Sequence, residues 1–219
     1  MQIKLPSGTQ ANLEIADSKR SDLGLVVIPD VMGWRPLFDD LISDLSRDWG
    51  VAVCGFELFP GQEQLGIEER LAAVSKIDDK FVFEDAISAA SLTKADRVGI
   101  LGFCMGGMYT LKCVSTKRFW RHCAFYGQIK LPETWKGVGQ AEPIACMEGG
   151  DPTSVLSIIG GIDPYTPPED VQLLETMGAS IEIYESADHG FVHDPSRPTH
   201  REVDAKDAWS KAKSWFLNT

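Results

Sequence analysis

The residues with the clearest potential for chemistry are Gly102-Phe103-Cys104-Met105-Gly106, which follow an apolar run and precede a helical pattern. A nucleophile on a sharp strand-to-helix turn has a strained backbone, and glycines two positions away on each side relieve the crowding. Cys104 would lie over a helix N-terminus, where unpaired N–H groups favour a thiolate. The N–H of Met105 would point to where an oxyanion forms. We therefore predict that Cys104 is a nucleophile and not merely a packed core cysteine.

Asp163 and His189 supply the other groups that such a nucleophile needs. Asp163 comes after an apolar run that ends in Gly160-Gly161, and His189 comes after an alternating segment at 181–185. Both residues are therefore expected in loops at the carboxyl edge of a sheet, where open α/β sheets bind their ligands. The chain order nucleophile, acid, histidine is that of α/β-hydrolase sites. We predict that His189 accepts the thiol proton and that Asp163 fixes the imidazole tautomer.

A metal site made of His189, His193 and Asp194 is the competing interpretation. Two histidines four residues apart reach one ion when a helix carries them. Gly190 and Pro195 disfavour a helix there, so we predict no metal at these residues. We also expect no cofactor.

Apolar runs indicate the strands that must position these groups. A hairpin is expected over 3–15, with its turn at Pro6-Ser7-Gly8. Continuous apolar segments, typical of strands covered on both faces, lie at 24–29, 51–56, 96–103, 121–126 and 154–159. A further alternating strand is expected at 180–184.

Helical patterns alternate with these strands. They cover 36–49, 67–74, 81–92, 105–117, a segment from Thr166 to Gly178, and 205–216. Asp78 or Asp79 is expected to cap the third of them, and Thr166-Pro-Pro-Glu169 is interpreted as a capping box. Residues 127–142 are expected to form a surface excursion. The alternation predicts an α/β fold, a mostly parallel sheet with helices on both faces, in a single domain over residues 1–219.

Composition limits the function classes. Acidic residues outnumber basic ones by 32 to 21, for a net charge of −11, which argues against nucleic-acid binding. The N-terminal residues lack an apolar signal region, and the longest apolar run is too short to cross a bilayer. Five cysteines without CxxC spacing suit a reduced chain. We predict a cytoplasmic protein that does not bind membranes.

These motifs resemble the dienelactone hydrolase family of the α/β-hydrolase superfold. The resemblance runs from Leu25 to Phe216 and rests on three groups of residues. They are Gly102-Phe-Cys-Met-Gly-Gly107, Ile159-Gly-Gly-Ile-Asp163-Pro with Pro167-Pro-Glu-Asp170, and Asp188-His189-Gly-Phe191 with Arg197-Pro198 and Asp207-Ala-Trp209. The resemblance implies a triad of Cys104, Asp163 and His189.

The resemblance also implies roles for the segment Pro29-Asp30-Val31-Met32-Gly33. In the family an acidic residue at the position of Asp30 pairs with the resting thiol, and the next N–H, here that of Val31, completes the oxyanion hole with Met105. This chain departs from the family twice. Asp30 is one methylene shorter than the usual glutamate, and His193 stands where dienelactone hydrolase has an arginine that holds the substrate carboxylate. Arg35, Arg197 or Arg201 is expected to compensate.

Other polar and aromatic residues have weaker expectations attached to them. Trp34, Trp120 and Tyr126 are candidates for lining the pocket, although core packing explains them equally well. His122 and His200 are expected to be structural or solvated.

The function predicted from the sequence is hydrolysis of small carboxylic esters or lactones through a covalent acyl-enzyme, by a monomer or weak homodimer. In this mechanism the thiol proton of Cys104 passes either to His189 or, as the resemblance allows, to Asp30. One alternative is a general acyl hydrolase or thioesterase. The other is a non-catalytic binding or redox-sensing module in which Cys104 is an oxidisable thiol.

Overall fold

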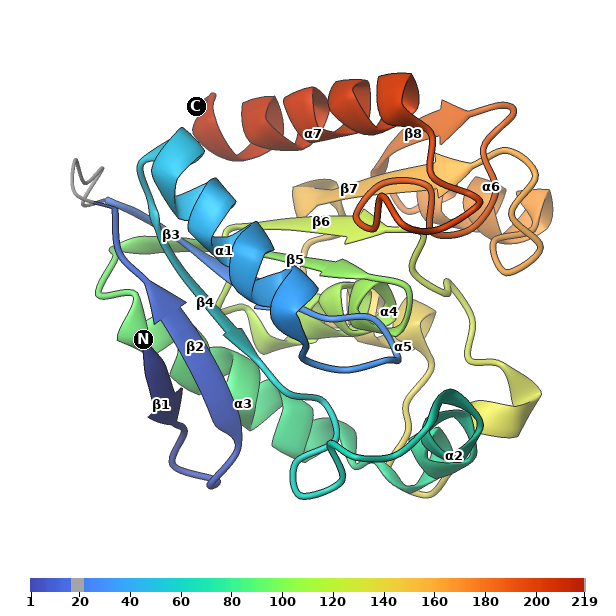
Figure 1. The fold of residues 1–219 in the computed structure, drawn as a ribbon. Helices are drawn as coiled ribbons and strands as arrows, with labels where there is room; N and C mark the ends of the chain where they lie inside the picture. The colour runs from blue at the N-terminus through green and yellow to red at the C-terminus, as the bar shows by residue number, and fades with distance from the viewer. Residues whose placement is uncertain (17–21, 219) are drawn as a thin grey trace.

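Eight strands form one sheet in the computed structural model, which describes residues 1–16 and 22–218 (Figure 1). The strand order is β1-β2-β4-β3-β5-β6-β7-β8. The strands are β1 (Gln2–Lys4), β2 (Gln10–Glu14), β3 (Leu23–Ile28), β4 (Ala52–Phe56), β5 (Arg97–Phe103), β6 (Arg121–Phe125), β7 (Val155–Gly160) and β8 (Ser180–Tyr184). The predicted α/β class and all the predicted strands are confirmed.

The pairing follows the hydropathy of each strand. The hairpin of β1 and β2 is antiparallel and joins β4 at the edge, whereas β4, β3, β5, β6, β7 and β8 run parallel. Every residue of β3, β4 and β7 is buried, as expected for strands covered on both faces. Because these strands are parallel, the loops after β3, β5, β7 and β8 emerge at one edge of the sheet.

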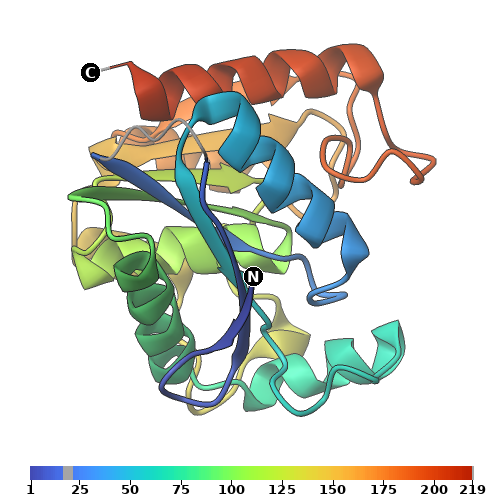
Figure 2. The same cartoon turned by 60° about the vertical axis from the view of Figure 1, so that its left-hand side comes forward.

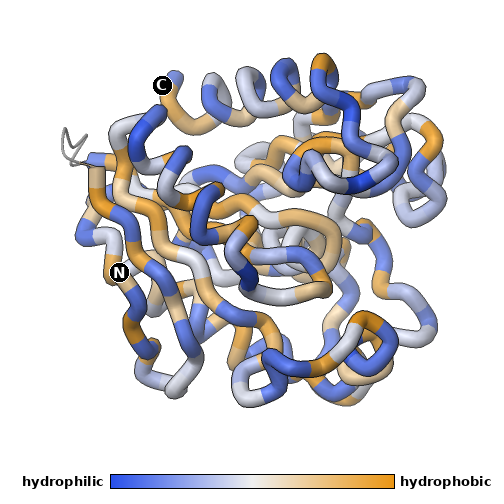
Figure 3. Tube along the Cα trace, in the orientation of Figure 1, coloured by the Kyte–Doolittle hydropathy of each residue, from blue (hydrophilic) through white to orange (hydrophobic). Residues whose placement is uncertain are grey.

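Helices cover both faces of the sheet (Figures 1 and 2). They are α1 (Pro36–Trp49), α2 (Ile67–Ala73), α3 (Asp79–Leu92), α4 (Met105–Lys112), α5 (Pro143–Glu148), α6 (Pro168–Thr176) and α7 (Glu202–Leu217). The buried side chains of α1 and α7 share one core cluster, and those of α3 and α4 share another on the opposite face. Figure 3 shows the apolar residues gathered in the strands between these layers.

The helix ends test the sequence signals directly. Pro36 begins α1, and Gly50 follows it in the left-handed conformation at φ 68°. The Asp78 side chain accepts a hydrogen bond from the Lys80 N–H, so the predicted cap of α3 is confirmed. The predicted capping box at Thr166 is wrong. Pro167 occupies the N-cap position of α6, and the Thr166 hydroxyl has no hydrogen-bond partner among the described residues.

Two other expectations need correction. The helix predicted over 105–117 ends as an α-helix at Lys112 and continues as a 3₁₀ turn, Cys113–Thr116. The stretch 127–142 is not merely a surface excursion, because Gln128, Ile129 and Trp135 are buried in it. The short helix α5, with Pro143 in its first turn, had no periodic pattern long enough to predict it.

Candidate active site

Cys104 lies on the sharp turn between β5 and α4. Its backbone has φ 55° and ψ −117°, a strained conformation for a residue with a side chain. The backbone hydrogen bond from the Cys104 N–H to the carbonyl of Phe125, 3.0 Å, fastens the turn to β6. Met105 is the first residue of α4, so its N–H has no acceptor within the helix. The turn therefore presents a thiol beside a free amide donor.

The glycines two positions before and after Cys104 allow this turn. A Cβ atom on Gly102 would lie 2.2 Å from the carbonyl oxygen of Gly106, and one on Gly106 would lie 2.3 Å from that of Pro29. Neither position accepts a larger residue without moving the backbone. The steric reason for the glycine spacing inferred from the sequence is thus present in the structure.

Asp163 and His189 meet at the same edge of the sheet. The loops after β7 and β8 bring the Nδ1 of His189 to 2.8 Å from Oδ2 of Asp163. Asp163 is buried, and its other carboxylate oxygen accepts the Tyr165 N–H at 2.8 Å. These contacts fix the direction of the imidazole ring, which leaves Nε2 as the nitrogen available for chemistry.

Nε2 of His189 faces the sulfur of Cys104. Burial of the ring lowers the pKa of His189, but its hydrogen bond to Asp163 and the adjacent Cys104 outweigh burial and raise that pKa to about 10. Nε2 makes no hydrogen bond of good geometry to any described residue in the resting arrangement. The structure thus brings together the three residues that the sequence singled out.

A cavity of about 600 Å³ opens onto these groups. Cys104, His189 and Val31 form part of its wall, and only 9% of Cys104 is exposed. Apolar residues make up much of the remaining wall. They are Ile67, Leu71 and Ala72 of α2, together with Pro132, Trp135 and Tyr165. A mostly apolar pocket with a few polar groups is typical of a small-molecule site.

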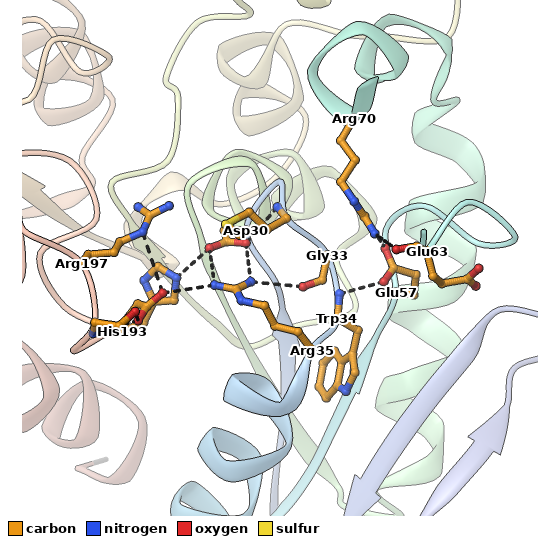
Figure 4. Close-up of polar contacts among 12 residues, drawn as sticks. Asp30, Gly33, Trp34, Arg35, Glu57, Glu63, Arg70, His193 and Arg197 are labelled. Carbon is orange, nitrogen blue, oxygen red and sulfur yellow. Dashed lines mark hydrogen bonds and ion pairs between the residues drawn. The ribbon is translucent and has the colours of Figure 1, made fainter. Parts of the chain in front are cut away.

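The carboxylate of Asp30 bonds to Arg35 and His193 and not to Cys104. Its carboxylate accepts hydrogen bonds from both Nη atoms of Arg35, at 2.7 and 3.0 Å, and from Nε2 of His193 at 2.9 Å (Figure 4). Burial would raise the pKa of Asp30, but the hydrogen bonds from His193 and Arg35 hold it well below its ordinary value. Among the described residues no hydrogen bond joins Asp30 to Cys104. The pairing with the resting thiol expected from the resemblance is therefore absent from this structure.

A second buried ion pair holds the other side of the same loop. Glu57 accepts the Trp34 N–H at 2.7 Å, and Arg70 of α2 donates to Glu57 at 3.3 Å (Figure 4). A Cβ atom on Gly33 would lie 2.3 Å from a nitrogen of Arg70, so only glycine fits beneath this pair. The loop that carries Val31 is thus clamped between two carboxylates.

Of the other residues predicted to contact the substrate, some line the cavity and others do not. Arg197 lies on the cavity wall, whereas Trp34 packs over Gly55 of β4 and Arg35 is paired with Asp30. Tyr126 is fully buried and its hydroxyl is 2.5 Å from Nδ1 of His193, so it lies behind the cavity. Arg201 is exposed and pairs with Asp204 at the start of α7.

The remaining two candidates lie at the amino-terminal end of β6. The Trp120 ring packs between the guanidinium groups of Arg97 and Arg121 at the edge of the sheet opposite the cavity, so it does not line the pocket. His122 is buried, and its Nδ1 is 3.0 Å from the Ser154 hydroxyl. Burial lowers the pKa of His122 to about 4, which fits the structural role predicted for it.

Most of the cavity wall was not predicted from the sequence, and two of the missed residues lie against Cys104 and His189. Gln128 is buried with its Nε2 3.8 Å from the sulfur of Cys104, and the ring of Tyr165 lies edge-on to His189 with centroids 4.9 Å apart. Both follow the carboxyl end of a strand, β6 and β7 respectively. That position was the available signal, because Asp163 and His189 were predicted from it.

Three further observations concern a metal site, disulfide bonds and membrane-spanning helices. His189 and His193 bond to different aspartates, and residues 1–16 and 22–218 hold no group of three or more His, Cys, Asp or Glu side chains suited to a metal ion. All five cysteines are free and buried. In the same described ranges, no helix has the length and apolar character needed to cross a membrane. The cytoplasmic location and the oligomeric state stay predictions.

A mostly parallel sheet with helices on both faces, and a sharp strand-to-helix turn flanked by glycines after β5, define an α/β-hydrolase fold. The chain belongs to the dienelactone hydrolase family, whose family model matches residues 11–219. The family resemblance inferred from the motifs is therefore confirmed, and with it the prediction of an enzyme that hydrolyses ester or lactone bonds.

Relatives and solved structures agree with this assignment. The chain is 29% identical over 202 residues to a probable 2-oxo-3-(5-oxofuran-2-ylidene)propanoate lactonase of Bradyrhizobium sp, covering 85% of this chain and 79% of the relative. It is 25% identical over 203 residues to a carboxymethylenebutenolidase of Rhodococcus opacus, covering 88% and 79%. A candidate dienelactone hydrolase of Klebsiella pneumoniae has the same fold, with a TM-score of 0.85 at 22% identity over 100% of this chain and 98% of the other.

Proposed function

We propose that Cys104, His189 and Asp163 form a catalytic triad that hydrolyses small carboxylic esters or lactones through a covalent acyl-enzyme. The observation that carries this proposal is the Asp163–His189 hydrogen bond of 2.8 Å beside a cysteine on a strained elbow that opens into a cavity. The raised pKa of His189 supports a thiolate–imidazolium pair in the resting enzyme.

The acylation step follows from the positions of these groups. The sulfur of Cys104 attacks the carbonyl carbon, and the N–H groups of Val31 and Met105 hold the negative oxygen of the tetrahedral intermediate. The C–O bond then breaks, and the departing alkoxide takes the proton from Nε2 of His189. With a lactone the alcohol remains attached to the acyl group.

Deacylation reverses the direction of proton transfer. A water molecule gives one proton to Nε2 of His189 as its oxygen attacks the thioester carbonyl. Collapse of this second intermediate breaks the C–S bond and releases the carboxylic acid. The thiolate and the imidazolium are thereby restored, with Asp163 holding the ring in place throughout.

Asp30 has a positioning role in this scheme. Its carboxylate holds Arg35, His193 and, at 3.0 Å, the N–H of Met32, which follows Val31 directly. Each bond tethers the loop that carries one of the two oxyanion donors. The bonds also keep the carboxylate ionised, so Asp30 is a poor acceptor for the thiol proton in this arrangement.

The size and lining of the cavity support a small substrate with an apolar body. Its volume of about 600 Å³ suits a small ester or lactone, and the apolar side chains of α2 would contact the body of the substrate. Arg197 is a cation on this wall. Its side chain is 28% exposed, and its ion-pair contact with Asp194 is long, at 4.0 Å. It is therefore available to a substrate carboxylate, such as the one in the lactone named for the Bradyrhizobium relative.

The test compares wild type with Cys104→Ala on a panel of lactones, aryl esters and thioesters. We expect turnover of at least one ester or lactone by wild type, loss of that turnover in the variant, and an acyl adduct on Cys104 by mass spectrometry. Cys123→Ala, which changes a buried cysteine of β6 that does not line the cavity, is the matched control. Undiminished turnover by Cys104→Ala would exclude the proposed nucleophile.

A further inference from the structure

Lys112 is a fully buried cation that the mechanism above does not use. It is the last residue of α4, and 0% of it is exposed. Its ammonium group has three N–H donors. They face the two carboxylate oxygens of Asp79, at 2.9 and 3.0 Å, and Oε1 of Gln140 at 2.7 Å. A buried charge is costly unless it is paired and hydrogen-bonded, so this cluster holds Gln140 firmly against the end of α4.

The neighbours of Gln140 determine the orientation of its amide. An ammonium group only donates, so Oε1 is the atom that faces Lys112. Backbone carbonyls only accept, so the NH₂ group is the end that faces them. Nε2 of Gln140 donates to the carbonyls of Val74 and Ile77 at 3.1 and 2.8 Å. One side chain thus joins α4 to the segment that directly follows α2.

The backbone just before Gln140 also packs against this segment. A Cβ atom on Gly137 would lie 1.8 Å from the carbonyl oxygen of Ser75. A Cβ atom on Gly139 would lie 2.8 Å from Cα of Asp78. The two backbones approach so closely that only glycine fits at these positions. Two segments that are far apart in the sequence therefore form one unit around Gln140.

This unit carries the apolar wall of the cavity. The apolar wall consists of Ile67, Leu71, Ala72, Pro132 and Trp135. The first three belong to α2, which ends directly before the segment that Gln140 holds, and the last two come directly before Gly137. The 3₁₀ turn Glu133–Trp135 also contacts α2 (Figure 1). Gln140 therefore fastens both parts of the apolar wall at their ends.

The nucleophile and the anchor of this wall lie at opposite ends of one helix. Cys104 is the N-cap residue of α4, and Lys112 is the last of its 8 residues. At a rise of 1.5 Å per residue, such a helix is about 12 Å long, and a short helix does not stretch. Through Lys112 and Gln140, α4 thus fixes the apolar wall relative to the sulfur.

We infer that Gln140 is a positioning residue that holds the apolar wall at a set distance from Cys104, so that the enzyme favours esters and lactones whose apolar body is long enough to contact that wall. Gln140 acts through α2 and residues 132–135 and does not itself touch the substrate. This inference rests on the proposed function and adds the substrate size that the site prefers.

The experiment compares ethyl acetate with two longer esters, ethyl hexanoate and hexyl acetate, which extend the acyl and the alcohol side by the same number of methylene groups. We expect wild type to favour at least one longer ester by about tenfold or more in kcat/KM, because the apolar wall contacts its body. Gln140→Met keeps the length of the side chain and loses its hydrogen bonds. The preference should then fall to about threefold or less, through a higher KM for the longer ester with kcat retained.

Gln140→Glu tests the link to the wall separately from the link to Lys112. The carboxylate keeps an acceptor for the ammonium group but faces the carbonyls of Val74 and Ile77, to which it cannot donate. The preference for the longer ester should therefore fall as it does in Gln140→Met. If Gln140→Met does not fold, Gln140→Asn, which withdraws the same amide by one methylene, should lower the preference in the same direction.

Ser46→Ala is the matched control. The Ser46 hydroxyl of α1 donates to the carbonyl of Val51 at 2.9 Å, a buried hydrogen bond on the other face of the sheet. Its loss should lower stability in urea and leave the ratio of kcat/KM for the longer ester and ethyl acetate unchanged. This ratio does not depend on how much of a preparation is folded, so a merely structural role for Gln140 would leave it unchanged as well.

The outcomes distinguish this inference from the function beneath it. A preference that survives in Gln140→Met and Gln140→Glu, or equal kcat/KM for all three esters in wild type, would overturn the role of Gln140 and leave the triad intact. Failure of wild type to hydrolyse any ester or lactone in the panel would instead overturn the proposed function and, with it, this inference.

Discussion

Two Asp–His pairs lie close together at the edge of the sheet, and they behave oppositely. His189 and His193 are four residues apart in one loop, and each bonds to an aspartate from a different strand end, Asp163 after β7 and Asp30 after β3. Both rings are largely buried. Nevertheless the pKa of His189 is raised to about 10, whereas burial lowers the pKa of His193 below its ordinary value.

The difference arises from the other charges around each ring. His189 lies between Asp163 and the sulfur of Cys104, both of which favour its charged form. The bond to Asp30 favours a charged His193, but burial outweighs it, and the positive charges of Arg197 and Arg35 add to the effect of burial. A neutral His193 then donates from Nε2 to Asp30 and accepts the Tyr126 hydroxyl at Nδ1. In the proposed mechanism, two Asp–His pairs of the same residue types therefore give one histidine that carries a proton, His189, and one that holds the loop in place, His193.

The largest expected effect is the loss of the proton carrier. His189→Gln should lower kcat by about 10³-fold to 10⁴-fold, because both the base and the acid of the scheme are removed. His193→Gln should lower kcat by about tenfold or less, since it loosens the loop of Val31 without removing a reacting group. Steady-state kinetics on one activated ester gives both numbers. Equal losses in the two variants would mean that the two pairs do not have separate roles.

The next effect concerns stability. Asp30→Ala leaves Arg35 without its main partner and removes the acceptor for His193, so the free energy of unfolding should fall by about 3 kcal/mol. Urea denaturation measures this change. Asp30→Ala combined with Arg35→Met should recover part of the loss, because the uncompensated charge is then gone. A change of less than about 1 kcal/mol in Asp30→Ala would contradict the clamp.

The contrast between these pairs also shows what the sequence can and cannot reveal. Gly102, Cys104 and Gly106 could be predicted because the constraint on them is local: the two glycines make room for one turn. Asp163 and His189 could be predicted because parallel strands bring their carboxyl ends to one edge. Each step uses either adjacent residues or a rule of topology.

The partners of Asp30 could not be predicted in the same way. They depend on the reach of the Arg35 side chain and on a ring delivered by a loop 163 positions further along the chain. Gln128 was missed because the polar, glycine-rich stretch 127–142 suggested a surface loop, although Gln128, Ile129 and Trp135 are buried. Composition indicates exposure only on average, whereas the burial of Gly127 and Ile129 is decided by their packing against α4.

A smaller effect appears in the dependence of stability on pH. The folded pKa of His193 is lowered, so the unfolded chain binds the proton first and stability falls as the pH drops below about 6.5. The folded pKa of His189 is raised, so its contribution is complete below about 6.5 and is lost as the pH rises toward about 10. Each group changes the free energy of unfolding by at most about 1.4 kcal/mol per pH unit.

Urea titrations of wild type, His189→Gln and His193→Gln from pH 5 to 10 would separate the two contributions. We expect His193→Gln to flatten the acidic limb of the stability profile and His189→Gln to flatten the alkaline limb. Both variants flattening the same limb would show that the rings do not differ in protonation as described.

The smallest expected effect is on KM, and it distinguishes Arg197 from Arg201. Arg197 lies on the cavity wall, whereas Arg201 is engaged with Asp204. Arg197→Gln should raise KM severalfold for an ester that carries a carboxylate and leave KM for a neutral ester unchanged, because only the first substrate gains from the cation. Arg201→Gln serves as the matched control and should change neither value by more than about twofold. A guanidinium nitrogen of Arg197 lies 2.2 Å from the position that a Cβ atom on Gly190 would take, so the two residues are packed together. An equal rise in KM for both esters after Arg197→Gln would therefore indicate lost packing against Gly190 and not lost recognition of charge.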